Sequence, residues 1–240
     1  MSPRAFPAVV LAAALVPAAA LLLSPASARS DDPASAPAAA EAASAGPRIC
    51  LLPLGKHDAR LLGKAAAGIK AYYRFPVKVM DKLPMPTSAY YPARKRHRAD
   101  KLLDYLDETV VPSSGCAIVI GFTSQDISTT KGSSRDWGIF GLGRISGTSA
   151  VVSTFRLGRK TADRKLVAAR TIKVVNHELG HVLGLPHCPT PACMMNDAEG
   201  SIKTVDREQG NLCDSCRKTV QSLFHVVIPE GKPDWDTLLQ

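Results

Sequence analysis

The sequence predicts an α+β fold, or α/β in a looser classification, in which helices pack on a mixed sheet. Three short and continuous apolar runs, at residues 48–55, 77–80 and 116–121, have the length and composition of buried strands. Residues 62–73 and 98–111 repeat apolar side chains at helical spacing. Strands that alternate with helices in this way form a sheet covered by helices, with the third apolar run as a central strand.

The middle of the chain predicts a loop followed by two strands. Residues 123–136 are polar and rich in Ser and Thr, so we expect a surface loop that could act as a lid. Residues 137–142 and 149–155 predict two further strands on either side of a turn that contains glycine.

Two long helices are expected in the last third of the chain. The first runs from Thr161, as its N-cap, to about Leu183, and Gly184 stops it. The second covers residues 206–224. Residues 229–240 carry no informative pattern and are expected to form a C-terminal tail.

The N-terminal segment has the pattern of a secretory signal peptide. Arg4 precedes an almost wholly apolar stretch that ends at Leu23, and residues 26–28 offer small side chains to signal peptidase. We expect cleavage after Ala28, which removes residues 1–28. The alternative is an uncleaved membrane anchor, because the apolar stretch is nearly long enough to span a bilayer. Its prolines argue against a stable spanning helix.

A spacer and one folded domain are expected after the signal peptide. Residues 29–46 consist of Ala, Ser, Pro and acidic residues with no bulky apolar side chain, a composition that predicts disorder. The folded domain is then expected over residues 47–228, because a chain with 45% hydrophobic residues can bury one core. We expect a monomer that is secreted or periplasmic, with no membrane span once the signal peptide is removed.

The chain is basic, with a formal net charge of +9. This charge favours contact with acidic surfaces, but the basic residues are not arranged as in a nucleic-acid-binding protein, so we expect no nucleic acid partner. The densest basic run, residues 94–98, lies where the second helix is expected to begin. A solvated helix face is the favoured interpretation of this run over a binding patch.

The residues that carry chemistry are concentrated in the segment 177–187, which reads HELGHVLGLPH. On a helix His177 and His181 are four residues apart and project from one face, so both imidazoles can bind one ion. Gly184 can adopt the left-handed conformation that ends a helix and allows His187 to return as a third ligand. Three histidines that leave a fourth position for water are typical of a catalytic zinc site.

Glu178 follows the first histidine and is the candidate catalytic residue. Zinc lowers the pKa of a bound water to about 7, and a neighbouring carboxylate can accept the proton of that water and return it to a leaving amine. The segment therefore predicts a zinc-dependent metallopeptidase, whose substrate is a peptide or protein.

Four cysteines and a methionine extend this pattern. The run from His177 to Cys216 reads HExxHxxGxxHC, four residues, C-x-M, seventeen residues and C-x-x-C. It resembles the signature of the archaemetzincin family, a branch of the metzincin clan, in every fixed position. Weaker similarity upstream extends the resemblance over roughly residues 47–224.

The resemblance has implications for the fold and the site. It implies a metzincin-like zincin fold with a twisted mixed sheet, an active-site helix and a C-terminal helix. Met195 matches the methionine whose loop lies beneath the catalytic metal. A second, structural zinc is implied, which makes two zinc ions in all, and its ligands match Cys188, Cys193, Cys213 and Cys216.

The state of the cysteines is left open by the sequence. In an oxidising compartment the four cysteines could form two disulfides, although the retained spacing and the resistance of metal-bound thiolates to oxidation favour zinc. Cys50 and Cys116 lie outside the signature. They are expected to be either buried free thiols or a disulfide with each other.

The resemblance also implies that an edge strand pairs with an extended peptide, and residues 137–142 are the candidate. Trp137 and Phe140 could line the substrate cleft or belong to the core. Neither the preferred side chain nor the choice between endopeptidase and aminopeptidase follows from the sequence. A non-catalytic, zinc-stabilised module that binds peptides or proteins is the alternative function, and Glu178 argues against it.

Overall fold

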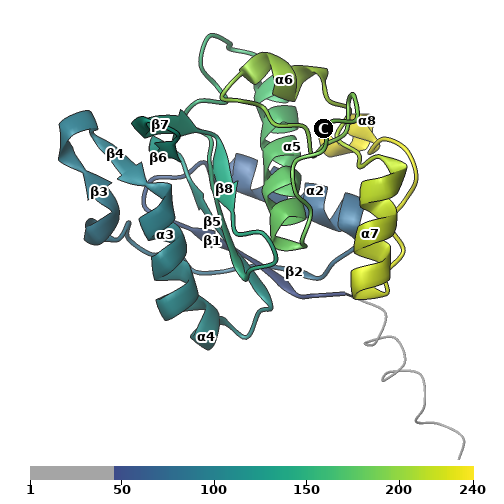
Figure 1. Ribbon diagram of the computed structural model, residues 1–240, viewed down its shortest axis with the longest axis horizontal. Helices are drawn as coiled ribbons and strands as arrows, with labels where there is room; N and C mark the ends of the chain where they lie inside the picture. The colour runs from purple at the N-terminus through teal and green to yellow at the C-terminus, as the bar shows by residue number, and fades with distance from the viewer. Residues whose placement is uncertain (1–45) are drawn as a thin grey trace, which may run out of the picture. The chain divides into compact units, whose positions relative to one another are not determined.

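The computed structural model describes residues 46–240, which form α and β elements in one unit (Figure 1). The expected signal peptide, residues 1–28, and nearly all of the expected spacer lie outside the described residues. The principal sheet has five strands, of which four are parallel and the last is an antiparallel edge. In spatial order they are β2 (Val77–Val79), β1 (Ile49–Pro53), β5 (Ile118–Thr123), β9 (Ser149–Ser153) and β8 (Gly141–Gly143).

Helices cover both faces of this sheet, which confirms the predicted α+β architecture (Figure 1). Successive side chains of β1 point to opposite faces. Ile49 and Leu51 pack into the core under α2 (Ala59–Tyr73) and α5 (Arg164–Val182). Cys50 and Leu52 pack into a second core under α3 (Ala99–Tyr105). The continuous apolar composition of the central strands follows from their burial on both faces.

The prediction of a surface loop over residues 123–136 is wrong. This segment contains most of a hairpin formed by β6 (Ile127–Lys131) and β7 (Ser134–Ile139). The hairpin belongs to a second sheet, with the order β3 (Tyr90–Tyr91), β4 (Arg96–Arg98), β6 and β7. Its residues are largely polar because much of the hairpin is half-buried or exposed, so no apolar run marks the strands.

The basic run 94–98 is also different from the prediction, because its last three residues form β4 instead of a helix start. The side chains of Arg96 and Arg98 are each only 16% exposed. Arg96 lies 2.9 Å from a carboxylate oxygen of Asp126 and 2.9 Å from one of Asp136. The run is therefore not a solvated helix face, since acidic side chains of the β6–β7 region pair with it.

The predicted helices exist with changed boundaries. The second continues from α3 through a π-helical stretch, Leu106–Val110, into α4 (Val111–Ser114). The long helix α5 begins two residues later than predicted, because Asp163 caps it and not Thr161. The Asp163 carboxylate accepts hydrogen bonds from the backbone N–H groups of Lys165 and Leu166, at 2.8 and 3.1 Å.

The predicted final helix is interrupted. The structure has α6 (Ile202–Arg207) and α7 (Asp214–Phe224), separated by a segment in which Gly210 has φ +79°. The C-terminal tail is folded as well: α8 (Trp235–Leu238) places the Trp235 ring against Gly210. Within residues 46–240 no helix has the length and apolar composition that crossing a membrane requires.

Candidate functional site

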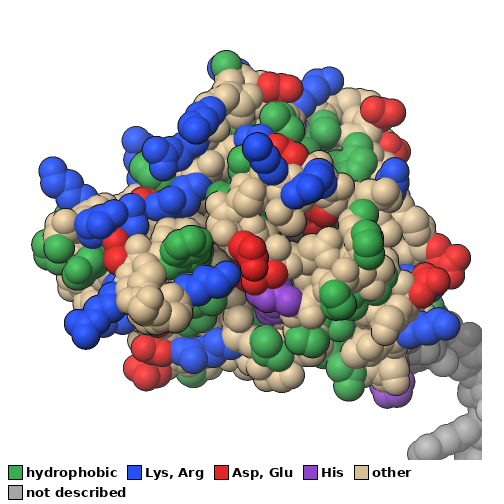
Figure 2. Space-filling model, turned by 45° about the horizontal axis from the view of Figure 1, so that its top comes forward, with side chains coloured by type: hydrophobic (Ala, Val, Ile, Leu, Met, Phe, Trp, Pro, Cys, Tyr) green, Lys and Arg blue, Asp and Glu red, His purple; other side chains and the backbone are tan. Residues whose placement is uncertain are grey.

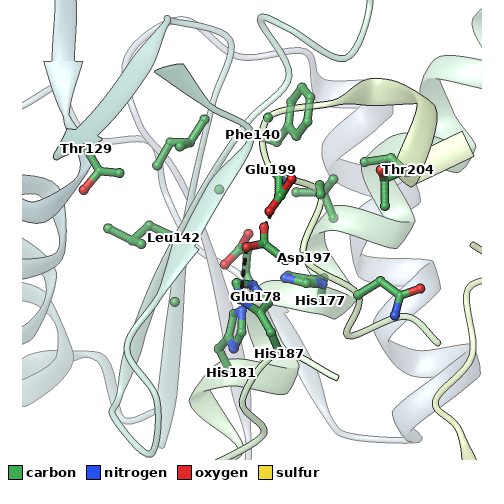
Figure 3. Close-up of a pocket in the computed structure, with 18 of the residues that line it drawn as sticks. Thr129, Phe140, Leu142, His177, Glu178, His181, His187, Asp197, Glu199 and Thr204 are labelled. Carbon is green, nitrogen blue, oxygen red and sulfur yellow. Dashed lines mark hydrogen bonds and ion pairs between the residues drawn. The ribbon is translucent and has the colours of Figure 1, made fainter. Parts of the chain in front are cut away.

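Helix α5 and the turn after it bring three histidines together (Figure 3). His177 and His181 are one helical turn apart, and their ring centroids are separated by 4.7 Å. Gly184 has φ +96°, which ends the helix and turns the chain back. The ring of His187 then lies 4.8 Å from that of His181 and 5.5 Å from that of His177. One ring nitrogen of each histidine lies within 4.8 Å of the others.

Backbone carbonyls set the orientation of two of these rings. Nδ1 of His177 lies 2.6 Å from the carbonyl oxygen of Met194, and Nδ1 of His181 lies 2.8 Å from that of Leu185. Because a carbonyl oxygen only accepts, Nδ1 must carry the proton in both rings, which leaves each Nε2 as a free donor atom for a metal.

Two of the histidines are also kept neutral, as metal binding requires. Burial, together with the neighbouring His181 ring, lowers the pKa of His177 to about 3. Burial lowers the pKa of His181 as well. Three converging imidazoles, two of them held by outer hydrogen bonds, fit a tetrahedral zinc ion with one open position.

Glu178 lies beside this cluster in a buried position, with 6% of its surface exposed. Burial raises the pKa of Glu178 to about 8, and a hydrogen bond with the Gly143 backbone offsets this only in part. A carboxyl group with a pKa near neutrality can both accept and return a proton.

Two glycines of β8 allow α5 to approach the edge strand. A Cβ atom on Gly141 would lie 2.5 Å from Cγ of Glu178, and one on Gly143 would lie 2.5 Å from the Glu178 carbonyl oxygen. A larger residue at Gly143 would have to move the helix, and one at Gly141 would displace the Glu178 side chain. The sequence analysis placed a strand near these glycines but did not identify their role. Alternate glycines in a strand just before a zinc-binding helix are the signal that could have indicated it.

Met195 lies directly beneath α5. It is fully buried, and a Cβ atom on Gly180 would lie 2.5 Å from its Sδ. The preceding residue, Met194, supplies the carbonyl that holds His177. The turn at 194–195 therefore supports both the helix and the first histidine.

The four cysteines of the signature form a second cluster. Their sulfur atoms all lie within 4.8 Å of one another, and no disulfide joins them. The Sγ atoms of Cys188 and Cys213 are 3.8 Å apart, and the backbone N–H of Cys213 donates to Sγ of Cys193 at 3.3 Å. Cys216 completes the set from the first turn of α7. Four converging thiols with N–H donors to sulfur fit a closed tetrahedral zinc site.

The remaining two cysteines behave differently. Cys50 and Cys116 form a disulfide, with their Cα atoms 5.9 Å apart, which joins β1 to the chain just before β5. One chain thus contains both a disulfide and a cluster of four unpaired thiols.

Adjacent tyrosines of α2 connect to both clusters. The hydroxyl of Tyr73 donates to the carbonyl of Asn176 at 2.9 Å, one residue before His177. The hydroxyl of Tyr72 accepts from the backbone N–H of Leu212 at 2.6 Å, one residue before Cys213. Both hydroxyls lie in the core. The sequence predicted only an apolar helix face over residues 62–73, and it predicted no link from this helix to the site.

A cavity of about 500 Å³ borders the histidines. Its walls come from the edge strand β8, from α5, from the β6–β7 hairpin and from residues 196–200 and 204–208. Trp137 lines the cavity and is 38% exposed, whereas Phe140 lines it while packing into the core. The predicted lid region is therefore a strand wall of the cavity at residues 129–131.

Comparisons with known proteins agree with this geometry. The model of peptidase family M54 matches residues 70–222. An archaemetzincin from Halobacterium salinarum is 33% identical over 182 residues, which cover 72% of this chain and 99% of the relative.

Solved structures show the same similarity. The crystal structure of archaemetzincin from Methanopyrus kandleri has a TM-score of 0.64 at 31% identity and covers 75% of this chain and 96% of its own. That of archaemetzincin from Archaeoglobus fulgidus has a TM-score of 0.61 at 28% identity, over 72% and 99% of the two chains. The family match, the similarity in sequence and fold, and the arrangement of histidines and cysteines agree. The chain therefore belongs to peptidase family M54, the archaemetzincins, and is a zinc metallopeptidase.

Proposed function

We propose that the peptidase reaction takes place at the three-histidine cluster, with Glu178 as general base and with His177, His181 and His187 as ligands of the catalytic zinc. The observation that carries the proposal is the juxtaposition of three converging imidazoles with the buried carboxyl group of Glu178 at the edge of one cavity. When bound, zinc supplies Lewis-acid polarisation of the scissile carbonyl and lowers the pKa of the attacking water.

Glu178 moves the protons of the reaction. Its carboxylate accepts a proton from the attacking water and then returns that proton to the nitrogen of the leaving amine. Burial favours the neutral form of Glu178, so its carboxylate is a strong enough base to accept a proton from water. With a pKa near neutrality, the protonated form of Glu178 can also donate that proton to the leaving amine. A hydrogen bond with the Gly143 backbone holds the carboxylate beside the edge strand.

The edge strand β8 is the proposed binding site for the substrate backbone. β8 is the last strand of the five-stranded sheet and borders the cavity along Gly141, Leu142 and Gly143. Its free edge offers N–H and C=O groups to an extended peptide, which would pass beside Glu178.

The cysteine cluster is proposed as the site of a second, structural zinc. The four sulfur atoms use every position of a tetrahedral ion, so no position remains for substrate. The role of this ion is to connect the turn after His187 to the start of α7.

An exported location is proposed for the protein. The Cys50–Cys116 disulfide supports it, because disulfides form and persist in oxidising compartments such as the periplasm and the extracellular space. The signal-peptide pattern of residues 1–28 points to the same compartments.

Metal analysis combined with a peptide-library assay on the wild type and Glu178→Gln tests the catalytic proposal. We expect two zinc ions in both proteins and a loss of turnover of at least about 10²-fold in the variant, since a positioned base contributes that much. Glu230→Gln, a change at an exposed carboxylate on the C-terminal segment, is the matched control. Two zinc ions with no turnover of any peptide in either protein would instead support the non-catalytic binding module.

A further inference from the structure

The cavity beside the histidines has the opposite charge to the rest of the chain. The chain carries a formal net charge of +9. Among the described residues, the cavity is nevertheless lined by one ammonium group, that of Lys131, and by four carboxyl groups, those of Glu178, Asp197, Glu199 and Glu208. Figure 2 shows Asp and Glu side chains beside a histidine in the middle of this face, with Lys and Arg side chains spread around them.

Two of these carboxyl groups lie at the mouth of the cavity. Asp197 is 3.6 Å from the ammonium of Lys131 and 3.6 Å from Nδ1 of His187 (Figure 3). Glu199 is exposed, and its backbone N–H donates to the Asp197 carboxylate at 2.8 Å. The ammonium that lines the cavity is thus already paired with Asp197, and no other Lys or Arg among the lining residues is available to the remaining carboxyl groups.

Glu208 is the buried member of the set. Only 8% of its surface is exposed. Within residues 46–240 no group hydrogen-bonds to its carboxyl, and Lys173 acts on it only as a nearby charge. The ammonium of Lys173, the cation on the neighbouring helix, instead donates to the backbone carbonyls of Val205 and Glu208, at 2.9 and 2.6 Å. Burial raises the pKa of Glu208 to about 8, and Lys173 offsets this only in part.

An unpaired buried carboxyl group costs folding free energy, and a cationic ligand would remove that cost. Apolar side chains of Phe140, Val174 and Val205 line the same cavity. An apolar wall with a carboxyl group fits the shape of a lysine or arginine side chain, which has an aliphatic stem and a cationic head.

We propose that this cavity selects peptides with a lysine or arginine side chain next to the scissile bond, and that Glu208 binds the cationic head of that side chain. The inference rests on the proposed function, because it takes the cavity to be the substrate site. A free N-terminal ammonium has the same chemistry, so the test separates the two sources of charge.

The test uses the zinc-loaded full chain and matched peptides. Two N-acetylated peptides differ at one position, which holds either lysine or its uncharged analogue norleucine, and a third is the norleucine peptide with a free N-terminus. We expect kcat/KM for the lysine peptide to exceed that for the acetylated norleucine peptide by tenfold or more, on the order expected for a specific polar contact. Mass spectrometry identifies the cleaved bond, which should adjoin the lysine.

Glu208→Gln tests the assigned residue. We expect the ratio of kcat/KM between the lysine and norleucine peptides to fall to about one, while Glu230→Gln, at an exposed carboxylate outside the cavity, keeps the wild-type ratio. Equal cleavage of the two acetylated peptides by the wild type would overturn the proposal, and so would an unchanged ratio in Glu208→Gln. A preference for the free-amine peptide alone would assign the cavity to N-terminal recognition and also overturn it.

A binding measurement keeps this inference separate from the proposed function. Affinities of the same peptides for zinc-loaded Glu178→Gln are measured by calorimetry, which requires no turnover. Tighter binding of the lysine peptide, lost on adding Glu208→Gln, supports the inference even if no peptide is cleaved. Absence of cleavage with that binding preference intact would contradict only the catalytic proposal.

Discussion

The histidine cluster and the cysteine cluster meet at adjacent residues, His187 and Cys188, yet their surroundings are opposite. The His187 side chain is 47% exposed and borders the cavity. In the cysteine cluster Cys193 and Cys216 are buried, and the four sulfur atoms would fill every position of a tetrahedral ion. A site that leaves one position open can act on a substrate, whereas a closed site can only stabilise the fold.

The two clusters also share their supports. The segment between Cys188 and Met195 closes on itself through a 2.8 Å hydrogen bond from the backbone N–H of the first to the carbonyl of the second. Met194 donates its N–H to Asn211, near Cys213, and offers its carbonyl to His177. Damage to the cysteine site should therefore reach the histidines, while damage to the histidines should leave the cysteines intact.

Cys213→Ser should have the largest effect on stability. We expect the loss of one zinc ion and a fall in the free energy of unfolding on the order of 5 kcal/mol, because the binding energy of a structural zinc contributes directly to folding. Urea denaturation and elemental zinc analysis measure the two quantities. Unchanged zinc content and stability would show that the cysteine cluster is not a zinc site.

His187→Ala should separate the two clusters. We expect loss of the zinc bound by the histidines, retention of the zinc bound by the cysteines, and a fall in kcat/KM of at least about 10²-fold. The midpoint of urea denaturation should change far less than in Cys213→Ser. A variant that lost both zinc ions would contradict the one-way dependence argued above.

Gly143→Ala should disturb the position of Glu178 without removing any of the proposed metal ligands. The added methyl group would meet the Glu178 carbonyl at 2.5 Å and push α5 from β8. We expect a loss of up to about 3 kcal/mol in stability and a fall in kcat, with both zinc ions retained.

Gly63→Ala is the matched control for this substitution. Gly63 lies in α2, and a Cβ atom there would meet nothing within 4 Å. The control should gain about 0.5–1 kcal/mol, because alanine favours a helix over glycine. If both alanine variants behaved alike, the close approach of β8 to α5 would have no catalytic importance.

Asp206→Asn should give the smallest effect, and one that depends on pH. Asp206 accepts two hydrogen bonds from the nearly buried Arg170 on α5, each 2.7 Å long. These bonds lower the pKa of Asp206 below its unfolded value near 3.8. The stabilisation is therefore fully present above about pH 4 and is lost as the pH falls through the lower folded value.

We expect the Asp206→Asn variant to be about 1.5 kcal/mol less stable than the wild type at pH 7, with the gap closing as the pH falls through the lowered pKa of Asp206. Urea denaturation of both proteins at several pH values measures the gap. Subtracting the stability of the variant from that of the wild type isolates the contribution of Asp206. Glu208 is present in both proteins, and its raised pKa gives its contribution to stability the opposite pH dependence. A gap independent of pH would contradict the role of this ion pair.

The predictions that succeeded rest on local geometry. The central strands and α2 were predictable because continuous apolar runs and helical periodicity reflect burial directly. Strand β6 and the first half of β7 were missed because they carry polar residues, such as Thr129 and Thr130, that have no apolar alternation to detect. The N-cap Asp163 was missed because Thr161, two residues earlier, is an equally acceptable capping residue by type.

The sequence by itself determined the zinc-binding pattern. Histidines four residues apart on a helix, a glycine that ends the helix, and cysteine pairs five and three residues apart bring the candidate ligands together through short-range covalent geometry. Only the tertiary structure decided what surrounds this pattern. The glycines of β8, the anchoring tyrosines of α2 and the carboxyl group of Glu208 reach the site from distant segments, and such contacts depend on how the sheet and helices pack. The chemistry of the site can therefore be predicted from one short segment, whereas the residues proposed to select a substrate come from several separate segments of the fold.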